Sequence, residues 1–343
     1  MAGMAVALAG AAGASSPDKV NWGTQQDEYS SDSAFAASKA VCRRLGNPIV
    51  PRADRPTPAE ARALKGCDSE KLYYGIGVKP DYARARHCAV IEADGGDDTV
   101  FSGSTILMQI YANGDGVKRN PDLATAFACT LDGAPFENQA RVSHMQDLKQ
   151  HPERVDFCDD ITSGLAQGQC AYHNSRMDAV GRDARLNALV ASFPPAARAA
   201  FAPLKKAFDA FVDAYGDGEV DLSGTARAAF VIEAEDGARD QFLKDLQRLK
   251  SGLWLGGNAA DARAADVLLN ASYRKALTIA GGKDNYTTIK PDDVRKAQRA
   301  WLVYRDAYLR FTAIAAPGVT GDAVLRRLTR LRVAQLDALG STD

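Results

Sequence analysis

Residues of the types that catalyse reactions or bind metals are scattered along this sequence rather than grouped. The chain has four histidines, and no recognisable motif surrounds any of them: His87, His144, His151 and His173. Acyl transfer needs a nucleophile, a base and an orienting acid in one constellation, and the serines, histidines and acids here show no such spacing. The sequence therefore predicts a protein that is not an enzyme and uses no cofactor.

Two stretches of the sequence have some features of a metal site. His144 and His151 are seven residues apart, which would place both on one helix face, but two ligands without a third do not form a zinc site. A second stretch, starting at Asp213, resembles a calcium-binding loop with a glycine at the sixth position. The residues that give this resemblance are Asp213, Asp217, Gly218, Glu219 and Asp221. Tyr215 occupies the third position and Gly224 the twelfth, where a bidentate carboxylate is needed, so we expect a solvated loop and no metal.

Two asparagines, Asn187 and Asn270, stand in apolar stretches of predicted helices, where a side-chain amide needs hydrogen-bonding partners. Arg305 and Asp306, on the helix expected to face them, could supply these partners. We favour a structural polar network that sets the register of the helices over a ligand site.

Composition indicates the fold class. The chain has 343 residues, of which 46% are hydrophobic and 25% charged, enough to bury two or three cores of roughly 100–200 residues each. A net charge of −1 gives no long-range field that would attract nucleic acid or an anionic membrane. Alanine, leucine and arginine dominate the periodic segments, so we predict an all-α protein.

The first fourteen residues, MAGMAVALAGAAGA, are typical of the hydrophobic region and cleavage zone of a secretory signal. A bilayer span needs about 20 residues, so no membrane insertion is expected. A disordered alanine-rich tail is the alternative, but six cysteines follow and suit an oxidising compartment. We predict a periplasmic or secreted protein in which residues 1–32 form a signal-like segment and a flexible arm.

A sequence repeat with a period of 39 residues comes next. YGIGVKPDYARA, from Tyr74, is echoed by NGDGVKRNPDLATA, from Asn113. Such a period indicates stacked supersecondary units, each with a helix ending at the Gly-x-Gly turn and a second helix starting near Asp81 or Asp122. The motif resembles the Sel-one-like repeats, relatives of the tetratricopeptide repeats, over about 58–135, with one extra residue in the second unit. We assign residues 33–150 to a helical-repeat domain.

Cys67 and Cys88 lie at similar distances on either side of the first Gly-x-Gly turn. An antiparallel helix pair would bring them within bonding range, so we predict a Cys67–Cys88 disulfide. The alternative is a pair of buried thiols.

The second half of the chain is organised around the segment Val294 to Phe311. Its apolar residues recur in steps of three and four, namely Val294, Ala297, Trp301, Tyr304, Tyr308 and Phe311. This is the narrow stripe that a helix buries against another helix. A similar stripe runs from Ala196 to Tyr215, where LKKAFDAFVDAY matches AQRAWLVYRDAY of the later segment.

This match indicates an internal duplication. Copies over about 157–215 and 258–311 would each be a helical hairpin, and two hairpins can close a four-helix bundle around their apolar stripes. A loop at 216–225 and a helix over about 226–249 follow the first copy, and a last helix spans 322–339. We assign residues 157–343 to this bundle.

Within the second half, a run of signature residues is similar to the lysozyme-inhibitor LprI-type N-terminal domain family. The signature is D-x-x-L-N-x-x-Y followed by Q-R-A-W-L-x-x-R-D, and its positions here include Asn270, Tyr273, Trp301, Arg305 and Asp306. A degenerate copy covers Cys170 to Tyr215. The resemblance implies a small, helical, disulfide-bonded domain that lies outside the cytoplasm and inhibits lysozyme.

The chain departs from the family at one cysteine, usually found shortly after the Arg-Asp pair and missing near Leu309. The bridge that this cysteine would form is therefore lost or rerouted. We expect Cys158–Cys170 to replace it, which leaves Cys42 and Cys129 to pair, although six cysteines allow 15 pairings.

Two functions fit these observations. The first is a periplasmic or secreted inhibitor of lysozyme or another peptidoglycan-cleaving enzyme, with Lys283, Tyr286 and Lys290 of the 283–290 loop entering an acidic sugar cleft. An ordinary connecting loop is the plainer interpretation of this segment. The alternative function is a cell-envelope adaptor that grips a protein partner through the helical repeats. The sequence does not identify the partner or the oligomeric state.

Overall fold

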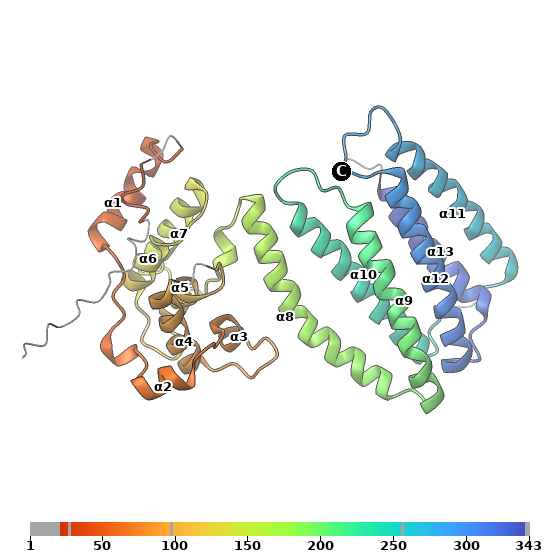
Figure 1. Ribbon diagram of the computed structural model, residues 1–343, viewed down its shortest axis with the longest axis horizontal. Coiled ribbons are helices and arrows are strands. Elements are labelled where there is room, and N and C mark those ends of the chain that lie inside the picture. The colour runs from red at the N-terminus through yellow and green to blue at the C-terminus, as the bar shows by residue number, and fades with distance from the viewer. Residues whose placement is uncertain (1–20, 27–28, 97–98, 255–256, 340–343) are drawn as a thin grey trace, which may run out of the picture. The chain divides into compact units, whose positions relative to one another are not determined.

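The computed structural model describes residues 21–26, 29–96, 99–254 and 257–339. In these ranges all regular secondary structure is helical, with thirteen α-helices, three short 3-10 helices and no strand, so the predicted all-α class is confirmed (Figure 1). No helix in the described ranges is both long and apolar enough to cross a membrane. The signal-like segment, MAGMAVALAGAAGA, lies outside the described residues.

The chain divides into two compact units, residues 1–162 and 163–343. The first contains α1 (Ala36–Leu45), α2 (Pro58–Ala63), α3 (Ser69–Tyr74), α4 (Tyr82–Gly95), α5 (Gly103–Asn113), α6 (Pro121–Ala128) and α7 (Pro135–Asp147), with 3-10 turns at Ser33–Phe35, Arg52–Asp54 and Phe157–Asp160. The second contains α8 (Gly164–Ala191), α9 (Pro195–Glu219), α10 (Arg227–Lys250), α11 (Ala259–Ala280), α12 (Pro291–Ala315) and α13 (Gly321–Ala338).

Part of the predicted flexible arm is anchored. Trp22 is buried, its backbone N–H donates to the Cys129 carbonyl at 2.8 Å, and its indole N–H donates to the Ser38 hydroxyl at 2.9 Å. The Lys39 ammonium lies 4.6 Å from the centre of the Trp22 ring. Residues 21–26 of the predicted arm therefore pack on the first unit, because one tryptophan supplies enough buried surface to anchor a polar segment.

The 39-residue repeat produces the same backbone turn twice. α3 ends at Gly75 and α5 at Gly114, both with left-handed φ angles, of 79° and 76°. Asp81 N–H donates to the Leu72 carbonyl at 2.9 Å, and 39 residues later Asn120 N–H donates to the Tyr111 carbonyl at 2.8 Å.

Asn120, and not Asp122, therefore occupies the position equivalent to Asp81. The Asp81 side chain caps α4 by accepting from the Arg84 N–H, and the Asn120 side chain caps α6 by accepting from the Leu123 N–H. The second unit therefore has no extra residue relative to the first. The sequence comparison introduced one because it aligned Asp122 with Asp81, whereas asparagine caps a helix as well as aspartate does.

Disulfides hold the short helices of the first unit together. Cys42 at the end of α1 is bonded to Cys129 after α6, and Cys67 before α3 is bonded to Cys88 in α4, as the sequence analysis expects. Cys158 and Cys170 are disulfide-bonded as well, and none of the cysteines is free.

In the second unit, the two apolar stripes meet. α9 and α12 pack along each other more extensively than any other helix pair and run antiparallel, since Phe201 contacts Phe311 while Gly218 lies against Asp293. Figure 1 shows the two helices side by side. At the centre of the pair, the rings of Phe211 and Tyr304 are stacked with centroids 5.7 Å apart.

The outer helices pair differently from the prediction. α8 packs mainly on α10, and α11 packs mainly on α13, whereas α8 makes little contact with α9. The predicted hairpins α8–α9 and α11–α12 are therefore not the packing units. Each proposed copy instead uses three helices, with its first and third paired and its middle helix in the shared α9–α12 core.

α9 continues to Glu219, where the sequence analysis predicted a loop from residue 216. A Cβ at Gly216 would lie 2.5 Å from Glu235 Oε1, and one at Gly218 would lie 3.0 Å from the Asp293 Cβ. These glycines let α9 approach α10 and α12 closely, and this packing outweighs the helix penalty of about 1 kcal/mol for each glycine.

The extension of α9 delivers Glu219 to Arg332 on α13. Both side chains are fully buried, and the two Arg332 Nη atoms donate to the two carboxylate oxygens at 2.6 Å each. Arg332 Nε also donates to Gln298 Oε1 at 2.9 Å. This bidentate pair joins the end of α9 to α12 and α13.

Candidate functional site

The loop from Gly281 to Lys290 connects α11 to α12 and is held in one conformation by Asn285. The Asn285 side-chain amide donates to the carbonyls of Ala280 and Ile289, at 2.9 Å each. Its Oδ1 accepts from the Thr287 N–H at 3.0 Å and from the Thr287 hydroxyl at 2.7 Å. A single asparagine therefore ties both ends of the loop together, in the way that such side chains commonly stabilise turns.

The segment after α9 supports the same loop. Asp221 Oδ1 accepts from the Thr288 N–H at 2.9 Å, and the Thr288 hydroxyl accepts from the Leu222 N–H at 2.7 Å. Burial alone would raise the pKa of Asp221, but hydrogen bonds from Ser223 and Thr288 outweigh it and lower the pKa below its usual value. Asp221 is therefore charged at neutral pH, and it acts as a structural support for the loop rather than as a calcium ligand.

Tyr286 stands out of this supported loop with 89% of its surface exposed. Lys283 and Lys290, on either side of it, are exposed too. The structure thus presents an aromatic ring and two ammonium groups on a backbone that is already ordered. Such a constellation can bind another molecule, and it contains no nucleophile–base pair that could catalyse a reaction.

The signature residues divide between core and surface. Trp301 is 2% exposed and belongs to the core, and Tyr273 packs against that core from α11. The Arg305 guanidinium lies 5.4 Å from the centre of the Trp301 ring and 2.8 Å from the neighbouring Asp306 carboxylate. These contacts indicate that much of the signature maintains the α12 helix and its packing.

The predicted asparagine network is absent. Asn270 is exposed, and its amide donates to the Asp266 carbonyl at 2.8 Å and to the Asp266 carboxylate at 3.2 Å, within its own helix. Asn187 is exposed as well, and Arg305 pairs with Asp306 instead. The prediction was wrong because it assumed that α8 and α11 face α12 through these positions, whereas they turn mainly toward α10 and α13.

The histidines do not form a common site. α7 ends at Asp147, so His144 and His151 do not share a helix, in contrast to the prediction; His144 lies between Asp160 and Glu153, and His151 contacts Asp147. His87 lies 3.8 Å from Glu60, and His173 is buried. Each histidine has its own local environment.

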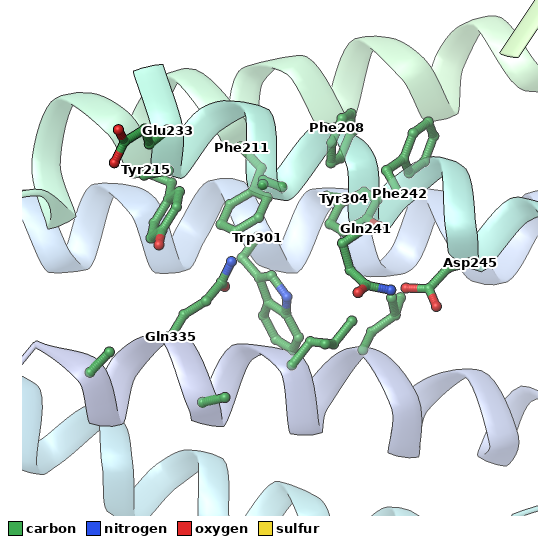
Figure 2. Close-up of a pocket in the computed structure, with 17 residues that line it drawn as sticks. Phe208, Phe211, Tyr215, Glu233, Gln241, Phe242, Asp245, Trp301, Tyr304 and Gln335 are labelled. Carbon is green, nitrogen blue, oxygen red and sulfur yellow. The ribbon is translucent and has the colours of Figure 1, made fainter. Parts of the chain in front are cut away.

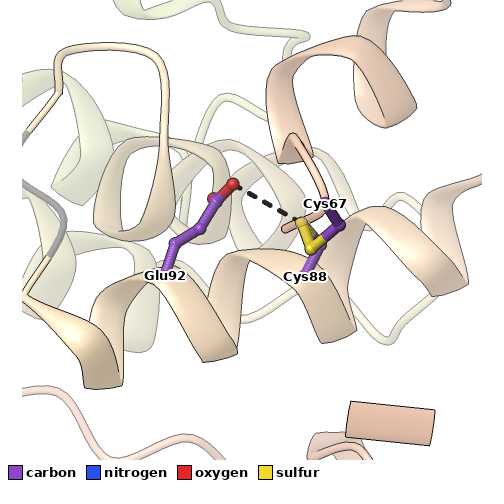
Figure 3. A group of neighbouring side chains, drawn as sticks. All are labelled: Cys67, Cys88 and Glu92. Atoms are coloured by element: carbon purple, nitrogen blue, oxygen red, sulfur yellow. Dashed lines mark hydrogen bonds between the residues drawn. A yellow bond between two sulfur atoms is a disulfide. The ribbon is translucent and has the colours of Figure 1, made fainter. Parts of the chain in front are cut away.

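Within the described ranges, one group of potential metal ligands converges, and it is formed by Cys67, Cys88 and Glu92 (Figure 3). The two sulfurs are joined in a disulfide and cannot act as thiolates. Glu92 accepts hydrogen bonds from the Ser69 N–H and the Gly103 N–H at 3.0 and 2.9 Å. The group is therefore a structural junction and not a metal centre.

A cavity that the sequence analysis missed lies among α9, α10, α12 and α13, with a volume of about 420 Å³. Four rings form its floor, Phe208 and Phe211 from α9 and Trp301 and Tyr304 from α12. Figure 2 shows these rings between the helices, with Gln241 and Asp245 side by side in one part of the wall. We call this cavity the aromatic groove. The duplication already aligned Phe208 with Trp301 and Phe211 with Tyr304, and that alignment was the available signal.

The second unit is thus an all-α bundle closed around a seam of aromatic side chains. The family model described as lysozyme inhibitor LprI matches residues 258–336 of it. This stretch contains α11, α12 and most of α13, so it extends beyond the predicted end of the copy at residue 311. No curated protein and no solved structure matches the chain. The second copy and the Sel-one-like repeats stay predictions.

Proposed function

We propose that this protein is an extracytoplasmic binding protein that inhibits lysozyme or another peptidoglycan-cleaving enzyme, with the 283–290 loop as its contact surface. The observation that supports it most directly is the exposed Tyr286 on an ordered loop, inside the stretch that matches the lysozyme-inhibitor family. Disulfide-bonded cysteines support a location in an oxidising compartment such as the periplasm.

Order in the free loop favours tight binding. The hydrogen bonds of Asn285 and Asp221 hold the backbone before any partner arrives, so less conformational freedom is lost on binding. Tyrosine is among the residues that contribute most to interfaces, because its ring is large, rigid and polar at one end. Tyr286 is therefore the expected anchor of the interface.

The charges of the loop suit the same class of partner. Enzymes that cleave glycosidic bonds usually carry two carboxylates in the sugar cleft. Lys283 and Lys290 are exposed beside Tyr286 and could approach such carboxylates. Complementary charge would mainly accelerate association and would weaken as the salt concentration rises.

The first test measures the lysis of purified cell walls by lysozyme in the presence of the oxidised protein. Inhibition at micromolar protein supports the proposal, and undiminished lysis at a micromolar excess rejects it. Replacing Tyr286 by alanine should raise the inhibition constant about 30-fold, the effect of losing roughly 2 kcal/mol at a central contact. Tyr172→Ala is the matched control, since Tyr172 is exposed on α8 in the same unit.

Charge reversal tests the lysines separately. Lys283→Glu with Lys290→Glu should slow association and remove its salt dependence, while Lys275→Glu, an exposed change on α11, should do neither. If the Lys275 variant behaves like the loop variants, the net charge of the protein explains the effect and the loop is not the contact surface.

The alternative function, an envelope adaptor, has one specific observation in its favour. Within the repeats, the first unit exposes Val78 by 47% and Tyr82 by 38%, although most of its apolar residues are buried. An adaptor would retain its partner in a pull-down after loss of residues 157–343 but not after loss of residues 58–135. Loss of the partner with residues 157–343 removed argues for the second unit instead.

A further inference from the structure

The aromatic groove has the size and lining of a small-ligand site. Its volume of about 420 Å³ falls in the range of roughly 300–1,000 Å³ that such sites occupy. Its walls are α10 and α13, which pack on the α9–α12 pair rather than extensively on each other. Alanines and a glycine line much of these walls, including Ala234, Gly237 and Ala334, so the space above the rings is not filled by large side chains.

A second cavity of about 420 Å³ shares Asp245 with the aromatic groove. We call it the arginine cavity, because among the described residues four arginines and one acid, Asp245, line it: Arg248, Arg326, Arg327 and Arg330. Trp254 and Leu253 complete its apolar wall. The largely apolar aromatic groove therefore lies next to the strongly cationic arginine cavity.

Asp245 cannot neutralise the arginine cavity. Its side chain is 2% exposed, and Arg327 Nη2 lies 3.1 Å from its Oδ1 while Arg248 Nη1 lies 4.0 Å from the same atom. Arg330 is exposed, and it forms no ion pair with any acid among the described residues. Arg248, Arg327 and Arg330 outnumber Asp245 among the described residues, so the arginine cavity keeps an excess of positive charge that suits an anion.

One buried polar group, the Tyr308 hydroxyl, belongs to a residue that packs against the wall of the arginine cavity. The Tyr308 hydroxyl is buried and has no hydrogen-bond partner among the described residues, and its ring contacts Trp254 at 5.6 Å. Burial raises the pKa of Tyr308, and the neighbouring Tyr304 and the charge of Asp245 raise it further, so the phenol is neutral. An unsatisfied buried hydroxyl on a residue that packs against the wall of the arginine cavity is a further feature of a ligand site.

We propose that the aromatic groove and the arginine cavity together bind a single-chain anionic amphiphile, with its carboxylate or phosphate group among the arginines and its apolar chain above the aromatic floor. Charge complementarity and the adjoining apolar channel are the two observations that select this ligand. The site involves no residue of the 283–290 loop, so it is independent of the proposed inhibition.

The test titrates the oxidised, full-length protein with decanoate, decyl phosphate and decanol and follows tryptophan fluorescence and heat. Two of the three tryptophans, Trp254 and Trp301, line the site, so occupation should change their emission. Decanoate or decyl phosphate should bind at least tenfold more tightly than decanol, and the tighter of the two anions assigns the headgroup. Equal binding of decanol, or no binding of either anion at 1 mM, overturns the proposal.

Variants distinguish binding in the two cavities from a nonspecific attraction of the anion to positive charge on the protein. Arg330→Gln should weaken the binding of the anion about tenfold, the loss expected for one charged hydrogen bond, while Arg299→Gln, on an exposed part of α12 outside both cavities, should leave it unchanged. Ala334→Phe, at an exposed position of the groove wall, should weaken the anions and decanol alike. Equal effects of Arg330→Gln and Arg299→Gln, or unchanged binding to the folded Ala334 variant, overturn the proposal.

Discussion

The two units of this protein hold their helices together by different means. The helices of the first unit are short, from six to fourteen residues, and disulfides and buried polar contacts such as Tyr73–Asp115 connect them. The helices of the second unit have 18 to 28 residues and close around stacked rings and one buried ion pair. A short helix buries too little apolar surface to be stable alone, so in the first unit disulfides supply stability that buried apolar surface supplies in the second.

The largest effect is expected at the buried ion pair of the second unit. Arg332→Met leaves the Glu219 carboxylate buried without its partner and should cost about 4 kcal/mol of unfolding free energy. Glu219→Met combined with Arg332→Met removes both charges and should recover most of that loss. Chemical denaturation of the three proteins measures the difference, and a double variant as unstable as the single one would show that the pair itself holds the unit together.

Removing the Cys42–Cys129 disulfide should lower the stability of the first unit alone. Cys42→Ala with Cys129→Ala opens a link between residues that are 87 positions apart and should lower the stability of that unit by roughly 3 kcal/mol. Hydrogen exchange resolved by segment distinguishes the units: protection should fall in α1 and α6 and stay constant in α9 and α12. An equal fall in both would contradict the division of stabilising forces.

A smaller effect is expected where α9 approaches α12. Gly218→Ala places a Cβ 3.0 Å from the Asp293 Cβ and should cost about 1–2 kcal/mol through overpacking. Gly237→Ala in α10 meets nothing within 4 Å and should stabilise the helix by roughly 0.5–1 kcal/mol. Thermal unfolding of the two variants should therefore shift in opposite directions, and a stabilised Gly218 variant would mean that the contact is loose.

The smallest effect concerns pH and the first unit. Burial alone would lower the pKa of His144, but its hydrogen bonds to Asp160 and Glu153 outweigh burial and raise the pKa. Because the pKa is higher in the folded state, the contribution of His144 to stability is complete below about pH 6.5 and is lost as the pH rises through the raised value. Solvent screening keeps this contribution below about 1 kcal/mol.

Comparing the unfolding free energies of His144→Gln and the wild type between pH 5 and 8 measures the contribution of His144. His151→Gln is the control because His151 is largely exposed. Asp160 sets a lower limit to the pH range of this comparison, because it must be charged to pair with His144. Burial raises the pKa of Asp160, although His144 and Arg141 oppose the rise. A stability difference that grows with pH would contradict the assignment.

The sequence predicted single helices well and their partners poorly. Steps of three and four residues placed Trp301, Tyr304 and Tyr308 in the core, since a buried stripe leaves a local periodic pattern. The pairing of α8 with α10 depends on which amphipathic faces fit each other, and no local pattern carries that information. The continuation of α9 through Gly216 and Gly218 was missed for the same reason, because its cause is contact with Glu235 and Asp293.

The candidate site shows a similar limit. The 283–290 loop and its lysines could be proposed from charge and position alone, but the order that Asn285 gives the loop required the structure. The arginine cavity was not predicted, because Asp245 and Arg327 come from segments 82 residues apart in the chain.

The pairing of α9 with α12 has a consequence for biosynthesis. Phe208 can contact Phe242 once α10 has been synthesised, but its other partner, Tyr304, lies roughly a hundred residues further along the chain, so the α9 rings are only partly covered until then. Contacts so distant along the chain slow folding and expose sticky surface to aggregation. The α9–α12 pair therefore forms late in synthesis, and part of the apolar surface of α9 is exposed until α12 has been made.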